Sequence, residues 1–180
     1  MSQAKLKETL QKTMAGIKSN PRAAKVVFRA QTQLDKDVRC SAKVRDFPPM
    51  AVDEPPSLGG ADAAMNPVEL MLVALGTCQE IMYAAYAAVM GIELDEVKVD
   101  VKGYLDLRGL FALDENVAAG YTKIQFETRI KSSADPEAIK KLADMVENHC
   151  PVLDTLTRAV EVSGKVTLNE GSVYEAKRAA

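Results

Sequence analysis

The sequence predicts an α+β fold, in which strands and helices occupy separate stretches of one 180-residue chain. The expected order is a β-hairpin, a long helix, two strands, a helix and a last strand, which differs from the regular strand–helix alternation of parallel sheets. The composition of 47% hydrophobic and 27% charged residues is close to the average for globular proteins. We therefore expect one domain, with a small appendage at most.

The charge and the N-terminal segment narrow the class of protein. A net charge of −2 without a basic run argues against nucleic-acid binding. The first residues, MSQAKLKETLQKTMAG, are polar and amphipathic, unlike a secretory signal peptide. A reducing cytoplasm is therefore the expected location, where cysteines are more often catalytic or buried than bridged.

The first element is a predicted helix over residues 2–19, which Asn20-Pro21 ends. Its apolar positions recur at spacings of four, four and three: Leu6, Leu10, Met14 and Ile17. Because this stripe is one residue wide, the helix is expected to dock on a surface or on a partner. Residues 1–24 are thus interpreted as an N-terminal helical extension.

A hairpin and a long loop follow. Residues 25–34 and 38–45 read as two strands joined by a short turn over 35–37. Four prolines and two glycines then mark a loop between Phe47 and Asn66. A loop of this length is often functional.

The next predicted element is a long apolar helix that ends at Gly91. Asn66 can cap it, Pro67 suits its first turn, and Glu69 suits its positive end. The helix would be roughly 35 Å long. Because it is apolar on nearly every face, it should be buried all round. One small domain cannot easily wrap such a helix, which predicts a homo-oligomer that shares a core.

The same helix also raises the question of a membrane span. Gln79 and Glu80 interrupt the apolar run near its middle, and an acidic residue there opposes insertion. Flanking basic residues of the positive-inside kind are missing as well. We therefore predict a buried core helix and no membrane partner.

The C-terminal half supplies the remaining elements. They are strands over 96–107 and 121–131 separated by a loop, a helix that starts at Asp135-Pro136, a helical turn after Cys150-Pro151, and a strand from Val160 to Val166. The predicted domain covers residues 25–168. Residues 169–180 are left as a C-terminal tail, whose last residues, EAKRAA, are expected to fray.

Three cysteines and one histidine are the side chains of this sequence best suited to act as a nucleophile or as a general base near neutral pH. A single histidine excludes a multi-histidine metal site, and the cysteines form no CxxC pair. A structural zinc is therefore not expected. The chemistry should depend on the thiols.

Cys150 stands directly before Pro151, at a predicted helix start. The backbone N–H groups and the helix dipole at such a position stabilise a thiolate. His149 could add a proton acceptor or a positive charge. The alternative interpretation is a buried cysteine beside a surface histidine.

Cys78 lies in the middle of the apolar helix, where burial raises the pKa of a thiol and makes it inert unless a cation is near. Arg39 and Arg45, on one face of the second strand, are the candidate cations, with Arg29 a less favoured third, although a solvated face would also explain the first two. Cys40 lies on the opposite face of that strand and is interpreted as a packing residue.

Two stretches, LGGADAAMNPVELMLVALGTC ending at Cys78 and NHCPV around Cys150, resemble the OsmC/Ohr family of osmotically inducible and organic-hydroperoxide-resistance proteins. The resemblance implies an OsmC-like fold, in which antiparallel sheets wrap around long central helices of an intertwined homodimer. It also implies two active sites at the interface between the chains.

The resemblance further implies thiol-dependent reduction of hydroperoxides in oxidative or osmotic stress defence. Cys78 would be the peroxidatic thiol and Cys150 the resolving thiol, with a thiol or dithiol reductant and no metal or haem. Arg39 is the best match for the family's activating arginine, and Arg45 is the alternative. An apolar pocket around Cys78 would favour organic hydroperoxides.

One position departs from the family pattern. The family places a catalytic glutamate ten residues before the peroxidatic cysteine, where this chain has Val68. Glu69 is adjacent, but one helical position rotates a side chain by about 100°. Glu54 is an alternative carboxylate.

Two other functions stay open. The first is a non-enzymatic dimer that binds a small hydrophobic ligand or senses redox state. The second is an assembly partner that uses the N-terminal helix.

Overall fold

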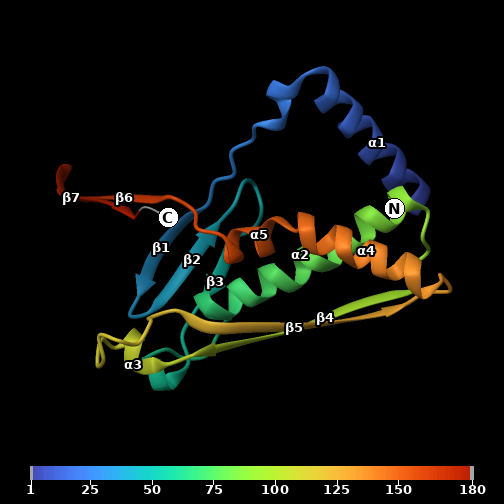
Figure 1. The fold of residues 1–180 in the computed structure, drawn as a ribbon. Helices are drawn as coiled ribbons and strands as arrows, with labels where there is room; N and C mark the ends of the chain where they lie inside the picture. The colour runs from blue at the N-terminus through green and yellow to red at the C-terminus, as the bar shows by residue number, and fades with distance from the viewer. Residues whose placement is uncertain (1, 179–180) are drawn as a thin grey trace.

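The computed structural model describes residues 2–178 and has the predicted α+β architecture (Figure 1). The helices are α1 (Gln3–Ser19), α2 (Pro67–Met90), α3 (Leu107–Leu110), α4 (Pro136–His149) and α5 (Pro151–Thr157), with short 3-10 helices η1 (Pro21–Ala24) and η2 (Pro56–Leu58). The strands are β1 (Gln31–Lys36), β2 (Arg39–Lys43), β3 (Met50–Val52), β4 (Glu96–Leu105), β5 (Tyr121–Lys131), β6 (Val162–Leu168) and β7 (Gly171–Arg178).

The described strands form three separate antiparallel sheets: β1-β2-β3, β4-β5 and β6-β7. The predicted long strands over 96–107 and 121–131 correspond to β4 and β5, which pair along nearly their whole length. Along β4, Val97, Val99 and Val101 are half-buried and alternate with exposed side chains. This alternation gives the ribbon one face that can pack against helices.

Helix α2 begins and ends where the sequence predicts. The side chain of Asn66 accepts a hydrogen bond from the Glu69 amide, and the Glu69 carboxylate accepts one from the Asn66 amide, which completes a capping box. At the other end Gly91 adopts the left-handed conformation with φ of +74°, which glycine reaches without steric cost.

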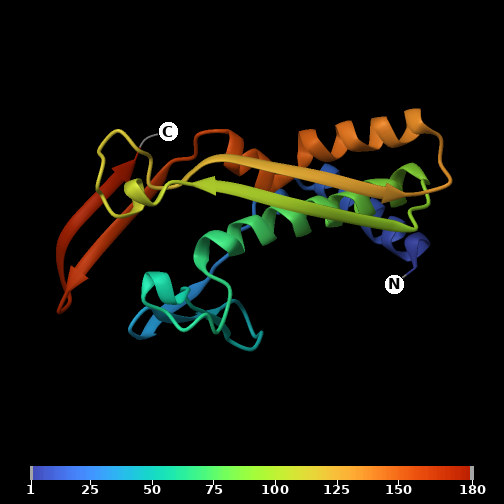
Figure 2. The ribbon, with the colours of Figure 1, turned by 90° about the horizontal axis from the view of Figure 1, so that it is seen from below.

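The core lies between α2, α4 and the β4-β5 ribbon, with both helices on the same face of the ribbon (Figures 1 and 2). A Cβ on Gly76 of α2 would lie 3.3 Å from Val101 Cγ2, so the glycine lets the helix approach β4 closely. Leu142 and Val146 of α4 are fully buried in the core cluster. Burial of each contributes about 1.5–3 kcal/mol.

The expectation that α2 is buried all round is wrong for the single chain. Its buried face holds the core, but the opposite face is open, with Val73 44% and Ile81 67% exposed. By length and composition α2 could also cross a membrane. A third of its most apolar window is nevertheless buried within the chain.

The first strand starts later than predicted. Residues 25–30 belong to no strand, β1 starts at Gln31, and Asp37 opens the turn with φ of +53°. The apolar side chains in this unpaired segment are exposed, Phe28 to 90%. Their strand propensity is not matched by a pairing partner among residues 2–178, which is why the prediction placed the boundary too early.

The N-terminal helix is a surface element, as expected. It has no buried residue, and its apolar side chains Leu6 and Leu10 are half-buried. Helix α1 packs beside the C-terminal part of α2, where the Gln3 side-chain amide donates to the Ile92 carbonyl oxygen. From there it projects away from the sheets, and residues 25–30 lead back to β1 (Figure 1).

The expected frayed tail is wrong up to Arg178. β7 pairs with β6 in a hairpin, and the last two residues lie outside the described part of the chain. The apolar side chains of this hairpin are exposed, including Val166 and Tyr174. The predicted limits of the domain, 25–168, stay a prediction.

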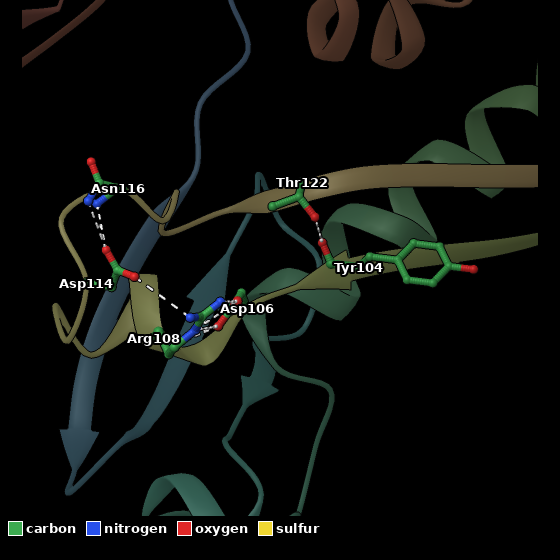
Figure 3. A network of polar contacts seen from close by, with 6 residues as sticks. All are labelled: Tyr104, Asp106, Arg108, Asp114, Asn116 and Thr122. Carbon is green, nitrogen blue, oxygen red and sulfur yellow. Dashed lines mark hydrogen bonds and ion pairs between the residues drawn. The ribbon is translucent and has the colours of Figure 1, made fainter.

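The loop after β4 contains α3 and a polar network (Figure 3). The Arg108 guanidinium pairs with Asp106 at 2.6 Å and with Asp114 at 3.8 Å, and it holds the pKa of Asp106 at about 2. The Thr122 hydroxyl donates to the Tyr104 carbonyl oxygen where the strand register shifts. The network closes this end of the ribbon.

Candidate active site

The structure brings Cys78 and Cys150 together. Cys78 is half-buried in the middle of α2, and Cys150 is fully buried where α4 meets α5. Both are free thiols. The Cys78 thiol interacts with the Cys150 thiol and with the backbone N–H of Val152 in the first turn of α5. Two thiols in direct contact can exchange between a reduced pair and a disulfide.

The local sequence explains the position of Cys150. It has extended backbone angles, with φ of −72° and ψ of 113°, between the last residue of α4 and Pro151 at the start of α5. Its N–H donates to the Val146 carbonyl oxygen and its carbonyl oxygen accepts from the Asp154 N–H. The predicted helix start at Pro151 is therefore confirmed. The Cys150 side chain, at the N-cap position, makes no capping hydrogen bond.

The surroundings of Cys78 favour the neutral thiol. Burial raises the pKa of Cys78, the Val152 N–H lowers it, and the Cys150 thiol raises it further. The direction of the shift is upward. Among residues 2–178 no cation is one of the groups that shift this pKa, and a nearby cation would favour the reactive thiolate.

The two candidate arginines lie elsewhere in the single chain. Arg39 is close to Asp53, whose pKa its charge lowers. The Arg45 guanidinium lies over the Phe47 ring, 4.6 Å from its centroid. Among residues 2–178, neither arginine is one of the groups that shift the pKa of Cys78. The activating role of Arg39, with Arg45 as alternative, stays a prediction.

The candidate carboxylates gather at the start of α2. Glu69 is engaged in the capping box, as its place in the first turn suggests. The Glu54 carboxylate accepts a hydrogen bond from the Asn66 side-chain amide at 3.3 Å. Val68 presents its carbonyl oxygen to the Tyr121 hydroxyl, at 3.0 Å. Among the described residues, none of these groups acts on the Cys78 thiol.

Asp53 is a structural residue that sequence reasoning missed. It is buried, and its carboxylate accepts backbone hydrogen bonds from Glu54, Ala61 and Ala63 at 2.9, 3.2 and 3.1 Å. The Ala63 N–H is the largest cause that lowers the pKa of Asp53. A Cβ on Gly60 would lie 1.8 Å from the Glu54 carbonyl oxygen. An aspartate ahead of a Gly-Gly pair is the signal that could have revealed this closed loop.

The remaining reactive side chains lie apart from the thiol pair. His149 Nδ1–H donates to the Met145 carbonyl oxygen at 2.9 Å, and its ring packs edge-on against Tyr86. Cys40 is half-buried in β2 opposite Leu34 and Val52. Among residues 2–178, no three His, Cys, Asp or Glu side chains form a group that could hold a metal ion.

An apolar pocket of about 280 Å³ lies next to the thiol-bearing helices. Its wall includes Leu75, one turn before Cys78 on α2, together with Leu153 and Leu156 of α5. Phe126 of β5 closes another side. The lining also includes Thr122, Lys123 and Thr157, and neither cysteine is part of it, so the pocket can hold a small, mainly apolar group beside α2 and α5.

Comparisons with known proteins identify the family and the fold. The chain matches the family described as OsmC-like protein over residues 59–165. A search of curated proteins finds no match.

Several solved structures share the fold. An OsmC-like protein from Mycoplasma pneumoniae superposes with a TM-score of 0.63 and 20% identity, over 73% of this chain and 87% of that one. An organic hydroperoxide resistance protein OsmC from Legionella pneumophila gives 0.57 and 18%, over 74% and 92%. An organic hydroperoxide resistance protein from Elizabethkingia anophelis gives 0.57 and 18%, over 74% and 91%.

Proposed function

This chain belongs to the OsmC-like protein family, and we propose that it is a homodimeric, thiol-dependent hydroperoxide reductase. The observation that carries the proposal is the contact between the thiols of Cys78 and Cys150 across α2 and α5. Relatives of the same fold are described as organic hydroperoxide resistance proteins. The cellular role would be defence against oxidative or osmotic stress, in the cytoplasm.

The reaction proceeds in two steps. The Cys78 thiolate attacks the terminal peroxide oxygen, so that an S–O bond forms and the O–O bond breaks. Sulfur is oxidised to a sulfenic acid, and the peroxide is reduced to an alcohol that takes up a proton. The Cys150 thiolate then attacks the Cys78 sulfur, which forms the disulfide and releases the sulfenic oxygen as water. A thiol or dithiol reductant restores both thiols by exchange.

The homodimer explains the apolar surface that a single chain leaves open. Val73 and Ile81 on the outer face of α2 would meet the same face of a second copy. Phe28 and its neighbours in the unpaired segment 25–30 would also be covered. Exposure of so many large apolar side chains is unusual for a monomer.

The second copy also offers a source for the missing cation. We assign activation of Cys78 to Arg39 of the partner subunit, with the partner's Arg45 as the alternative. A positive charge beside the thiol offsets the burial that raises its pKa. Glu54 is the carboxylate proposed to orient the arginine, because Val68 cannot and Glu69 is engaged in the helix cap.

The lining of the pocket favours organic hydroperoxides. Leu75, Leu153 and Leu156 offer an alkyl or aryl group an apolar environment, whereas hydrogen peroxide has nothing to place there. Cumene hydroperoxide is therefore the preferred test substrate.

Titration of free thiols tests the proposal. Addition of one equivalent of cumene hydroperoxide should remove the Cys78 thiol first and the Cys150 thiol second, as the disulfide forms. Cys78→Ser should abolish turnover, whereas Cys150→Ser should stop at the sulfenic acid. Cys40→Ser is the matched control and should behave like the wild type. Full peroxide turnover by Cys78→Ser would refute the proposal.

A second candidate is a non-enzymatic dimer that binds a small hydrophobic ligand or senses redox state. The raised pKa of Cys78 and the valine at position 68 favour it. Slow oxidation of Cys78 combined with a tightly held apolar ligand in the purified protein would decide for this alternative.

A further inference from the structure

Gln79, the residue after Cys78, is a buried polar side chain without a hydrogen-bond partner. It is 0% exposed, and neither its amide nitrogen nor its amide oxygen has a partner among the described residues. Buried amides are nearly always paired, because an unpaired one forfeits its hydrogen bonds to water. The reduced protein therefore keeps an amide whose hydrogen bonds are unused.

A second copy of the chain cannot supply this partner. Both polar atoms of Gln79 are already enclosed by their own chain, so no surface group of another molecule can reach them. The partner must be a buried water or a group already inside the site. The reaction itself changes one such group, the thiol of Cys150.

Helix register puts Gln79 at the level of Cys150 along the α2–α4 pair. Helices α2 and α4 run antiparallel (Figure 1), and Tyr83 of α2 shares the core cluster with Val146 of α4. One turn before Tyr83 is Gln79, and about one turn after Val146 is Cys150. The contact between Cys78 and Cys150 follows the same register. Gln79 and Cys150 are thus enclosed at the same level of the helix pair, and both are 0% exposed.

A fully buried resolving thiol needs a hydrogen-bond donor for its thiolate form. Cys150 must lose its proton to attack the sulfenic acid, and a thiolate without water requires a hydrogen-bond donor. An amide N–H is such a donor and remains neutral throughout. Among residues 2–178, the amide nitrogen of Gln79 is the one buried side-chain nitrogen without a partner.

We propose that Gln79 positions and activates Cys150 for disulfide formation. Its amide N–H donates to the Cys150 sulfur while the thiolate attacks the sulfenic sulfur of Cys78. The S–S bond forms as the S–O bond breaks, and the proton from Cys150 leaves with the hydroxyl group as water. This inference rests on the proposed function, because it concerns the second step of that reaction.

The test separates the two chemical steps. Wild type and Gln79→Leu are mixed with one equivalent of cumene hydroperoxide and quenched at intervals. Peptide mass spectrometry then follows the trapped sulfenic acid of Cys78 and the disulfide between Cys78 and Cys150. In Gln79→Leu, Cys78 should oxidise at the wild-type rate, and the disulfide should form about tenfold to a hundredfold more slowly, the effect of one hydrogen bond to a charged group. Excess peroxide should then oxidise the accumulated sulfenic acid of Cys78 to sulfinic acid.

Controls distinguish this role from a structural one. The melting temperature of Gln79→Leu should equal or exceed that of the wild type, since an unpaired amide is removed. Gln125→Leu, at an exposed glutamine of β5, should leave both steps unchanged. If Gln79→Leu does not fold, Gln79→Met offers the same test with a linear side chain.

Two results would overturn the inference. Disulfide formation at the wild-type rate in Gln79→Leu would mean that the amide holds a buried water and nothing more. Equal slowing of both steps would mean general disruption of the site. A wild-type Cys78 that cumene hydroperoxide does not oxidise would instead refute the proposed function itself.

Discussion

Ile81→Asp should break the homodimer. Ile81 lies near the middle of the outer face of α2 and is 67% exposed in the single chain. If two copies pack along this face, the side chain is buried twice, once in each copy. An aspartate there would place two carboxylates in an apolar interface, where desolvation opposes both.

The size of the effect follows from the exposed fraction. Complete burial of an isoleucine contributes about 1.5–3 kcal/mol. With 67% still exposed, each copy can gain about 1–2 kcal/mol, and the pair about 2–4 kcal/mol. The dissociation constant should therefore rise by about thirtyfold to almost a thousandfold from lost burial alone. The two charges add to this value.

Sedimentation equilibrium over a range of protein concentrations measures the change. Met145→Asp is the matched control, because it changes an apolar side chain of α4 that is 37% exposed and lies on another element. The control should dimerise like the wild type. A wild-type chain that sediments as a monomer, or an Ile81→Asp variant with an unchanged dissociation constant, would refute the argument.

Three further predictions concern the site and its supporting loop. Arg39→Ala should slow oxidation of Cys78 at neutral pH by about tenfold or more, because burial without a nearby cation raises the thiol pKa. The oxidation rate of this variant should keep rising with pH after that of the wild type has levelled off. Asp53→Asn should lower the urea midpoint near neutral pH. Because the pKa of Asp53 is lowered, its contribution is present above the ordinary carboxyl pKa and is lost as the pH falls through the folded value, so the two midpoints should converge in acid. Gly60→Ala should lower the melting temperature, since its Cβ would overlap a backbone carbonyl and cost about 1–3 kcal/mol.

Two of these predictions have a control variant within the chain, and the third has an outcome that would contradict it. Arg45→Ala should react like the wild type, and the reverse pattern would transfer the role from Arg39 to Arg45. Gly16→Ala adds a Cβ that meets nothing within 4 Å in α1, so it should be neutral or slightly stabilising. Midpoints of Asp53→Asn that run parallel to the wild type from neutral to acid pH would contradict the role of its carboxylate.

The elements predicted best are those specified by local chemistry. The limits of α2 follow from Asn66, Pro67 and Gly91, each of which acts within one turn of the helix end. β4 and β5 follow from strict alternation over many residues. Such signals need no knowledge of what the element packs against.

The features that were missed depend on contacts between distant residues. Residues 25–30 have the composition of a strand, but pairing requires a second strand that the chain does not offer there. β7 lacks a strong apolar pattern and forms because β6 lies beside it. Two of the three amides that bind Asp53, those of Ala61 and Ala63, lie eight and ten residues further along the chain, and the Gly-Gly pair is the one local sign of this loop.

The candidate site was predicted in part from local signals and in part depends on contacts between distant residues. Periodicity placed Cys78 in mid-helix and Pro151 placed Cys150 at a helix start, but nothing in either segment indicates that the two meet. The resemblance implied their pairing, and the antiparallel course of α2 and α4 brings the two residues to the same level. In the sequence Gln79 is only an interruption of the apolar run, and its complete burial is a property of the folded chain.

The two faces of α2 connect assembly with chemistry. The buried face holds Gln79 and the core, and Cys78 lies at its border, where burial raises the thiol pKa. In the single chain the raised pKa favours the neutral, less reactive thiol of Cys78. If the activating arginine comes with the second copy, which packs on the other face of α2, the pKa of Cys78 falls when the dimer forms. Peroxide turnover should then follow the dimer fraction, and Ile81→Asp should lose activity on dilution while its thiols remain intact.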